Sequence, residues 1–127
     1  MTEDIFAAKV AQVRQRFIST LDGKIAETCA ALPRLGADVP PDTATAAVTD
    51  AYQCIHGIVG IGSTVGFPAI GSAARDVEDV LRSPYKAGRA LTPDEISLLK
   101  NTLQTLRTVA TRELQVSHSP SQMSAWP

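Results

Sequence analysis

A chain of 127 residues is close to the commonest size of a single domain and can bury one hydrophobic core without disulfides or metal. Hydrophobic residues make up 44% of it but aromatic residues only 5%, which suits the aliphatic packing of helices. The formal net charge of −1 argues against a nucleic-acid surface or a polybasic membrane surface. We therefore expect no nucleic acid and no membrane among the partners, and proteins instead.

The two cysteines and the first residues bear on the cellular compartment. Cys29 and Cys54 both lie within apolar helical patterns, so we expect reduced, buried thiols. The opening MTEDIF is acidic, unlike a signal peptide, and no apolar run approaches the length of a membrane span. The sequence predicts a cytoplasmic protein.

The first part of the chain carries apolar residues three or four positions apart, which predicts one long amphipathic helix. These residues are Phe6, Val10, Val13, Phe17, Leu21, Ile25 and Leu32, with Thr28 as a polar interruption. Pro33 and Gly36 are expected to end this helix.

A second helix is predicted after the loop PRLGADVPPD, with Asp42 or Thr43 as its N-cap. Its apolar stripe consists of Val48, Tyr52, Ile55, Val59 and Gly62. His56 lies one position away from this stripe, and Gly66 is expected to break the helix.

A third helix is predicted over GFPAIGSAARDVEDVLRSP, followed by YKAGRA as a loop. Its apolar positions are Ile70, Ala73, Ala74, Val77, Val80 and Leu81, and its solvent side is expected to hold Arg75, Asp76, Glu78, Asp79 and Arg82.

The start of a fourth helix shows the capping-box pattern, with Thr92 as N-cap, Pro93 at the first helical position and Glu95 three residues after the threonine. Its apolar stripe consists of Ile96, Leu99, Leu103, Leu106, Ala110 and Leu114. No segment shows the alternation expected of strands.

Helices joined by short loops, each with one apolar stripe, predict an all-α fold. We expect an antiparallel four-helix bundle with up-down-up-down order over residues 1–116, and a flexible C-terminal tail over residues 117–127. His118 in that tail is expected to be solvated.

The segment IHGIVGIGSTVG, residues 55–66, combines His56 with four glycines, although a glycine inside a helix costs about 0.5 to 1 kcal/mol relative to alanine. On a helix, the side chains that share a face with His56 are those of Tyr52, Gln53, Val59, Gly60 and Ser63. Because Gly60 and Ser63 are small, one side of the imidazole is predicted to be open to another molecule. The alternative interpretation is a core or boundary histidine that bonds a neighbouring backbone group.

Other chemistries fit this segment poorly. Cys54 and His56 point about 200° apart on a helix and cannot easily share an ion, so no metal site is expected. The glycines lack the spacing and the lysine of a phosphate-binding loop. No base or orienting partner accompanies Ser63 or Ser72, as a hydrolase would need.

The offsets of His56, Gly60 and Gly66, followed by a helix with an acidic pair, resemble the histidine-containing phosphotransfer (HPt) domain family. Arg16 and Phe17 at the start of a long first helix are also similar to that family, and the resemblance covers roughly Ile5 to Leu114.

The resemblance implies that His56 accepts a phosphoryl group from a receiver-domain aspartate and passes it to another receiver in a multistep two-component phosphorelay. The chain would be a carrier rather than an enzyme and would act as a monomer. It would bind no cofactor itself, and the Mg²⁺ would belong to the receiver. Its partners would be response-regulator receivers and a sensor histidine kinase, possibly hybrid, with Tyr52, Gln53, Val59, Gly60 and Ser63 in the docking surface.

One residue departs from the family pattern, because Val59 stands where the family usually has a lysine. A charge-assisted hydrogen bond to a phosphoryl oxygen is worth roughly 1.5 to 3 kcal/mol, so its loss is expected to weaken phosphate retention or transfer. Arg75 and Arg82 are candidate replacements if their face turns toward His56.

Three other functions remain open from the sequence. The first is a degenerate module that binds receivers or kinases without accepting phosphate. The second is a dimerising structural bundle in which His56 is incidental. The third is an enzyme or haem protein that uses His56 as a ligand, although the bundle offers no second histidine for it.

Overall fold

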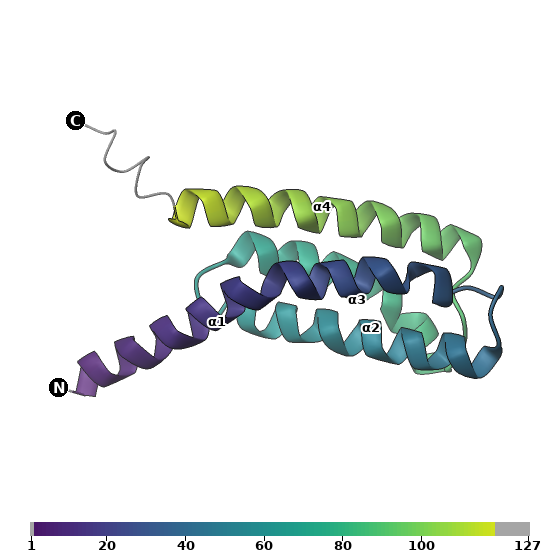
Figure 1. Ribbon diagram of the computed structural model, residues 1–127, viewed down its shortest axis with the longest axis horizontal. Helices are drawn as coiled ribbons and strands as arrows, with labels where there is room; N and C mark the ends of the chain where they lie inside the picture. Colours follow the sequence, from purple (N-terminus) through teal and green to yellow (C-terminus); the bar gives the residue numbers. More distant parts are fainter. Residues whose placement is uncertain (1, 119–127) are drawn as a thin grey trace.

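The computed structural model describes the backbone of residues 2–118 and the side chains of residues 5–115. Four helices alternate in direction (Figure 1). They are α1 (Thr2–Ala31), α2 (Pro41–Gly62), α3 (Pro68–Ala87) and α4 (Pro93–His118), with a short 3-10 turn, η1 (Leu32–Arg34), after α1. No strand forms within residues 2–118, so the predicted all-α bundle with up-down-up-down order is confirmed. The predicted start of the tail at residue 117 is wrong, because α4 continues to His118. Residues 119–127 of the predicted tail lie outside the described residues.

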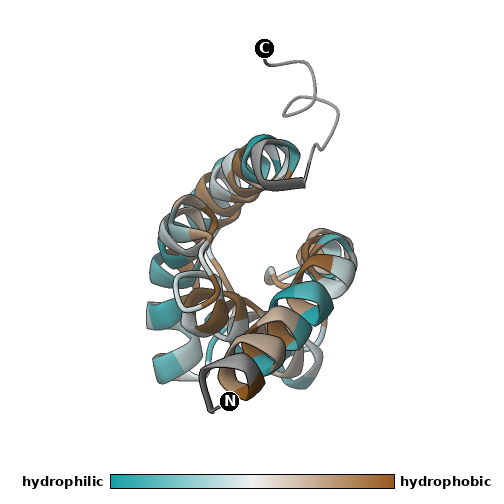
Figure 2. Cartoon of the chain, turned by 90° about the vertical axis from the view of Figure 1, so that its left-hand side faces the viewer, coloured by the Kyte–Doolittle hydropathy of each residue, from teal (hydrophilic) through white to brown (hydrophobic). Residues whose placement is uncertain are grey.

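The apolar stripe of α1 is covered along only part of its length. Phe17, Leu21 and Ile25 are buried in the core, whereas Phe6 and Val13 are exposed. The N-terminal part of α1 projects beyond the rest of the bundle, and the end-on view shows hydrophobic residues on this projection (Figures 1 and 2). The predicted stripe therefore extends past the end of the core that it packs against.

The predicted side-chain cap of α2 is wrong. The helix begins at Pro41, with Pro40 in the N-cap position and no side-chain hydrogen bond from Asp42 or Thr43 to the helix end. Proline has no backbone N–H to satisfy and its φ is already helical, so the first turn forms without a capping side chain.

The turn between α2 and α3 depends on glycine at two places. Gly66 has φ of +95°, a conformation that other residues adopt with strain. At Gly71 a methyl group would lie 2.6 Å from Ser63 Oγ, so the two helices can approach this closely only with glycine there. The break predicted at Gly66 is confirmed.

The N-terminus of α3 is capped by a residue from α4. The carboxylate of Glu113 accepts hydrogen bonds from the backbone N–H groups of Ala69 (3.2 Å) and Ile70 (2.9 Å). The negative charge also lies at the positive end of the helix dipole. A long-range contact thus replaces the local cap that α3 lacks.

The end of α3 differs from the prediction, which placed YKAGRA in a loop. The helix continues through buried Pro84 and through Tyr85 to Ala87. Gly88, with φ of +63°, ends it, and the N–H of Arg89 donates to the Pro84 carbonyl at 3.1 Å. A proline is tolerated in this last turn because only the preceding turn loses a hydrogen bond, and the extension brings Tyr85 against α2.

The capping box predicted for α4 is confirmed. Thr92 Oγ1 accepts from the Glu95 N–H at 3.2 Å, and Glu95 Oε1 accepts from the Thr92 N–H at 2.9 Å. Arg89 donates to both oxygens of Glu95, at 2.7 and 3.1 Å. These bonds from Arg89, and then those from Thr92, lower the pKa of Glu95 from its ordinary value of 4.5 to about 2.

Cys29 and Cys54 are free thiols, but both are half-buried rather than buried. None of the described helices contains an apolar stretch long enough to cross a membrane.

Candidate functional site

His56 lies on α2, two turns before the helix ends, and its side chain is 66% exposed. The expected open position of this ring is therefore observed, and the alternative of a core histidine is not. Its ring lies 5.8 Å from the ring of Tyr52, with an angle of 12° between the two planes. The stacking limits how far the imidazole can tilt toward α2.

The nearest acidic partner of His56 is Glu78 of α3, whose side chain is only 7% exposed. His56 Nδ1 hydrogen-bonds to Glu78 Oε2, and the other carboxylate oxygen, Oε1, accepts from Arg82 Nη2 at 3.1 Å. The prediction that Glu78 lies on the solvent side of its helix is wrong. Burial is possible because both carboxylate oxygens have charged or polar donors.

This contact determines which nitrogen of His56 is reactive. An ionised carboxylate only accepts hydrogen bonds, so Nδ1 carries the hydrogen and donates it to Glu78. In a neutral imidazole the other nitrogen, Nε2, then keeps its lone pair. Because Nδ1 is engaged with α3 and the ring is exposed, Nε2 is the nitrogen available to an external electrophile.

Arg82 links the site to a second carboxylate. Its Nη1 donates to Asp79 Oδ1 at 2.8 Å, and its side chain is 42% exposed. Desolvation alone would lower the pKa of the Arg82 guanidinium, but Asp79, the Tyr52 hydroxyl and Glu78 together raise it above its ordinary value. Arg82 is therefore a permanent positive charge beside the carboxylate that holds His56.

Aromatic stacking extends the site away from His56 along the contact between α2 and α3. The rings of Tyr52 and Tyr85 are 4.0 Å apart and nearly parallel, at 9°. Together with His56 they form a column of three stacked rings. Tyr85 joins this column only because α3 continues past Pro84, in the segment predicted to be a loop.

The other predicted site residues have different surroundings. Gln53 and Gly60 are exposed, and a methyl group at Gly60 would meet no atom within 4 Å. Val59 is half-buried and packs against the core, as its stripe position predicts, so it brings no polar group to the site. The hydroxyl of Ser63 lies close to Gly71 on α3.

Sequence reasoning did not identify Glu78 as a site residue, although a signal was present. Glu78 is four residues after Ala74 and three before Leu81, both of which are buried, so it lies at the border of the apolar stripe. An acidic residue at such a border needs a partner, and that partner is on another helix. Tyr85 was not identified either, because a proline such as Pro84 usually marks the end of a helix.

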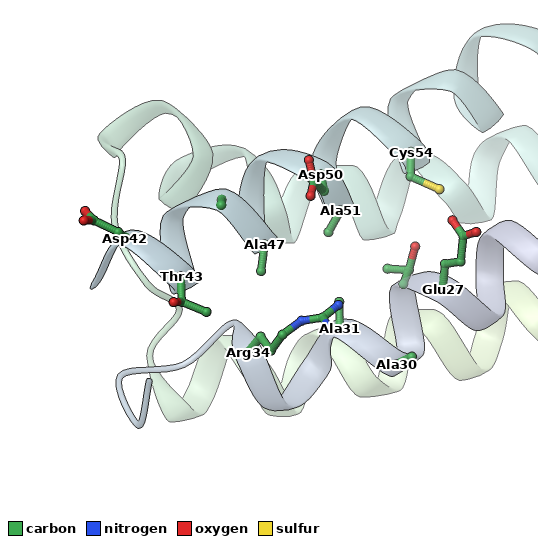
Figure 3. A pocket seen from close by; sticks show the side chains of 12 residues that line it. Glu27, Ala30, Ala31, Arg34, Asp42, Thr43, Ala47, Asp50, Ala51 and Cys54 are labelled. Atoms are coloured by element: carbon green, nitrogen blue, oxygen red, sulfur yellow. The ribbon is translucent and has the colours of Figure 1, made fainter. Parts of the chain in front are cut away.

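A groove of about 740 Å³ lies on a different side of α2, between α1 and α2 (Figure 3). Alanines line much of it, Arg34 extends along it, and Cys54 lies at one end. The Cys54 thiol lies 3.7 Å from the Lys24 carbonyl of α1, whereas His56 contacts α3. Their predicted divergence is therefore observed. Within the described residues, no three His, Cys, Asp or Glu side chains are grouped so as to hold a metal ion.

Comparison with known protein families matches residues 12–109 to the family described as the Hpt domain. Comparisons with curated proteins and with solved structures give no match. The matched range contains His56, Glu78 and Arg82, and it includes most of each of the four helices. The chain belongs to the Hpt domain family, the histidine phosphotransfer domains of two-component signalling, whose partners are receiver domains and histidine kinases.

Proposed function

We propose that this chain is a phosphoryl carrier in a multistep two-component phosphorelay and that His56 accepts the phosphoryl group. The observation that carries the proposal is an exposed imidazole held through Nδ1 by buried Glu78, with Nε2 left as the nucleophile. The donor and the next acceptor would each be the aspartate of a receiver domain.

The transfer would proceed by attack of the Nε2 lone pair of His56 on the phosphorus of an aspartyl phosphate. The Nε2–P bond forms as the P–O bond breaks, and the electron pair of that bond leaves with the aspartate carboxylate. The hydrogen on Nδ1 stays in place, so the phosphorylated ring carries a positive charge. Return transfer to a second receiver is the same step in reverse.

Glu78 would act as a positioning residue in this reaction. Its carboxylate fixes the tautomer that leaves Nε2 free, and it lies beside the ring when the ring becomes positive. Because Glu78 is buried on α3, which packs against α2, the hydrogen bond also fixes the direction of the imidazole.

The chain would supply the nucleophile and a docking surface, and the receiver would supply the acidic pocket and the Mg²⁺. Tyr52, Gln53, Val59, Gly60 and Ser63 would lie in or next to the docking surface, with Gly60 leaving room for the loops of the receiver. We also propose that the chain is a monomer in the cytoplasm, that it binds no cofactor, and that it catalyses no reaction by itself.

The test is to incubate the purified chain with a receiver that carries radioactive phosphate on its aspartate. We expect an acid-labile, alkali-stable label on the chain. The label should be absent from His56→Gln and unchanged in His118→Gln, which removes the other histidine of the sequence. A wild-type chain that binds several phosphorylated receivers without becoming labelled would contradict the carrier function.

One observation favours a second candidate function. Val59 stands at the position of the family's lysine and packs against the core, so α2 presents no cation there. The chain would then be a degenerate module that binds receiver or kinase domains without accepting phosphate. Binding without labelling in the same experiment would support this function.

A further inference from the structure

The helix that carries His56 contains no lysine or arginine. Its charged residues at neutral pH are Asp42 and Asp50, both acidic. A phosphoryl group on Nε2 would add up to two negative charges at a ring that already lies beside the carboxylate of Glu78. Positive charge for this group has to come from another helix.

Two contacts define how α2 and α3 are aligned. His56 bonds to Glu78, and Ser63 lies against Gly71. From His56 to Ser63 the chain advances seven residues, and from Glu78 to Gly71 it goes back seven. The two helices are therefore antiparallel and in constant register along this part of their contact.

This register places an arginine on each side of His56. Arg75, three residues before Glu78, lies at the level of Val59, three residues after His56. Arg82, four residues after Glu78, lies at the level of Tyr52, four residues before His56. The family's lysine position on α2 is thus opposite an arginine on α3.

The two arginines also share one edge of α3. They are seven residues apart, which is two turns and a difference of about 20° around the helix. Arg82 is tied to Glu78 and Asp79, whereas Arg75 is exposed and forms no ion pair within residues 5–115. One guanidinium is held in place and the other is available.

We propose that Arg75 and Arg82 form the cation pair that stabilises the phosphoryl group on His56, in place of a lysine at position 59. This inference rests on the proposed function. Arg82 offsets the charge of Glu78 from a fixed position, and Arg75 extends from α3 toward α2 beside Val59 to donate to the phosphoryl oxygens. Guanidinium groups suit this role because their planar donors match phosphoryl oxygens in pairs.

The test uses phosphoramidate as a small phosphoryl donor, so that no receiver has to be identified. The Nε2 lone pair attacks the phosphorus of phosphoramidate in the form whose nitrogen is protonated, the P–N bond breaks, and its electron pair leaves with that nitrogen as ammonia. The variants are Arg75→Gln, Arg82→Gln and the double variant. Arg107→Gln is the matched control, because it removes one positive charge from an exposed residue on α4 next to α1. The readouts are the rate of labelling and the half-life of the phosphohistidine, followed by ³¹P NMR.

We expect the labelling rate of the double variant, the half-life of its phosphohistidine, or both, to fall about tenfold or more. The double variant loses the charge-assisted hydrogen bond from Arg75 and the nearby positive charge of Arg82. Each single variant should lose less, and Arg107→Gln should match the wild type. Adding Val59→Lys to the double variant should raise its labelling rate, or the half-life of its phosphohistidine, threefold or more. The lysine returns a positive charge to the same level of the bundle, from α2 instead of α3. A purely structural role of the arginines predicts no such rescue.

The outcomes separate this inference from the function on which it rests. If the wild type is labelled, and the labelling rate and phosphohistidine half-life of the double variant stay within twofold of those of Arg107→Gln, the proposed role of the two arginines is wrong and the carrier function stands. If neither phosphoramidate nor any phosphorylated receiver labels the wild type, the carrier function is wrong and the arginine pair falls with it. Folding of each variant is checked by circular dichroism.

Discussion

Two glutamates of this chain make similar bonds in different regions of the molecule. Glu95 pairs with Arg89, six residues away, and Glu78 pairs with Arg82, four residues away. Glu95 finds its remaining donor within its own helix start, whereas Glu78 reaches His56, 22 residues earlier on another helix. Local bonds of the first kind fix where a helix begins, and long-range bonds of the second kind fix the direction of a reactive side chain.

Burial strengthens this contrast. Glu95 is partly exposed, so its bonds replace bonds to water at low cost. Glu78 is buried, and a buried ion pair is often no more stabilising than apolar residues of the same size. The position of Glu78 is therefore better explained by its effect on the imidazole of His56 than by its contribution to the free energy of unfolding.

The sharpest test of the contrast is Glu78→Gln, for which we expect labelling of His56 to slow by about 10- to 100-fold. The amide oxygen would keep the bond to Arg82, and the amide NH₂ group would then face Nδ1 and donate to it. The proton of the imidazole would move to Nε2, which would lose its nucleophilic lone pair. The rate of labelling by phosphoramidate measures the loss, and ¹⁵N NMR of the ring measures the tautomer.

Glu95→Gln is the matched control for this prediction, because it makes the same chemical change at the local site. Its labelling rate should equal that of the wild type. An unchanged rate in Glu78→Gln, or an Nε2–H tautomer already dominant in the wild type, would show that the carboxylate does not position the ring.

A third glutamate, Glu113, lies between these two cases, because it caps a helix but reaches it from a distance. Glu113→Ala leaves the N–H groups of Ala69 and Ile70 without an acceptor, and we expect the free energy of unfolding to fall by about 1 to 2 kcal/mol. Urea denaturation measures the change. Labelling of His56 should not change, and a large loss of labelling would mean that the start of α3 affects the site directly.

The local and long-range contacts also differ in how far the sequence predicts them. The apolar stripes of α3 and α4 and the capping box of Thr92 and Glu95 follow from spacing along the chain, and the structure confirms them. The exposure of His56 beside Gly60 follows from the same helical spacing. Each of these features depends on residues a few positions apart, which one sequence displays.

The features that the sequence did not predict all depend on contacts between helices. Glu78 is buried because His56 and Arg82 satisfy it, and α3 continues past Pro84 as Tyr85 packs on Tyr52. Spacing within one helix does not show which residues of another helix lie opposite. The alignment of α2 and α3 is the information that a single sequence lacks.

The local site should also respond to acid in a defined direction. The pKa of Glu95 is lowered in the folded chain from 4.5 to about 2, so its bonds stabilise the fold above pH 4.5. That contribution is lost as the pH falls from about 5 to about 2, where the folded carboxylate also binds a proton. Because Arg89 is exposed, we expect at most about 1 kcal/mol after solvent screening.

The measurement for this prediction is the free energy of unfolding against pH for the wild type and for Glu95→Gln. The difference between the two should be constant near neutral pH and should shrink toward pH 2. A difference that grows on acidification would mean that the carboxylate does not stabilise the folded state through its charge.

The smallest expected effect separates local helix propensity from partner docking at two glycines of α2. A methyl group at Gly57 or at Gly60 would meet no atom within 4 Å, so alanine at either position should raise the free energy of unfolding by about 0.5 to 1 kcal/mol.

Gly60 shares a helix face with His56, whereas Gly57 points about 100° away from it. Gly60→Ala should therefore slow phosphoryl transfer from a receiver several-fold and leave labelling by phosphoramidate unchanged, because only the larger donor needs the space. Gly57→Ala should gain the same stability and change neither rate. Equal transfer from a receiver in both variants would mean that the receiver does not approach His56 over Gly60, and the docking surface would then have to lie on the α3 side of the ring.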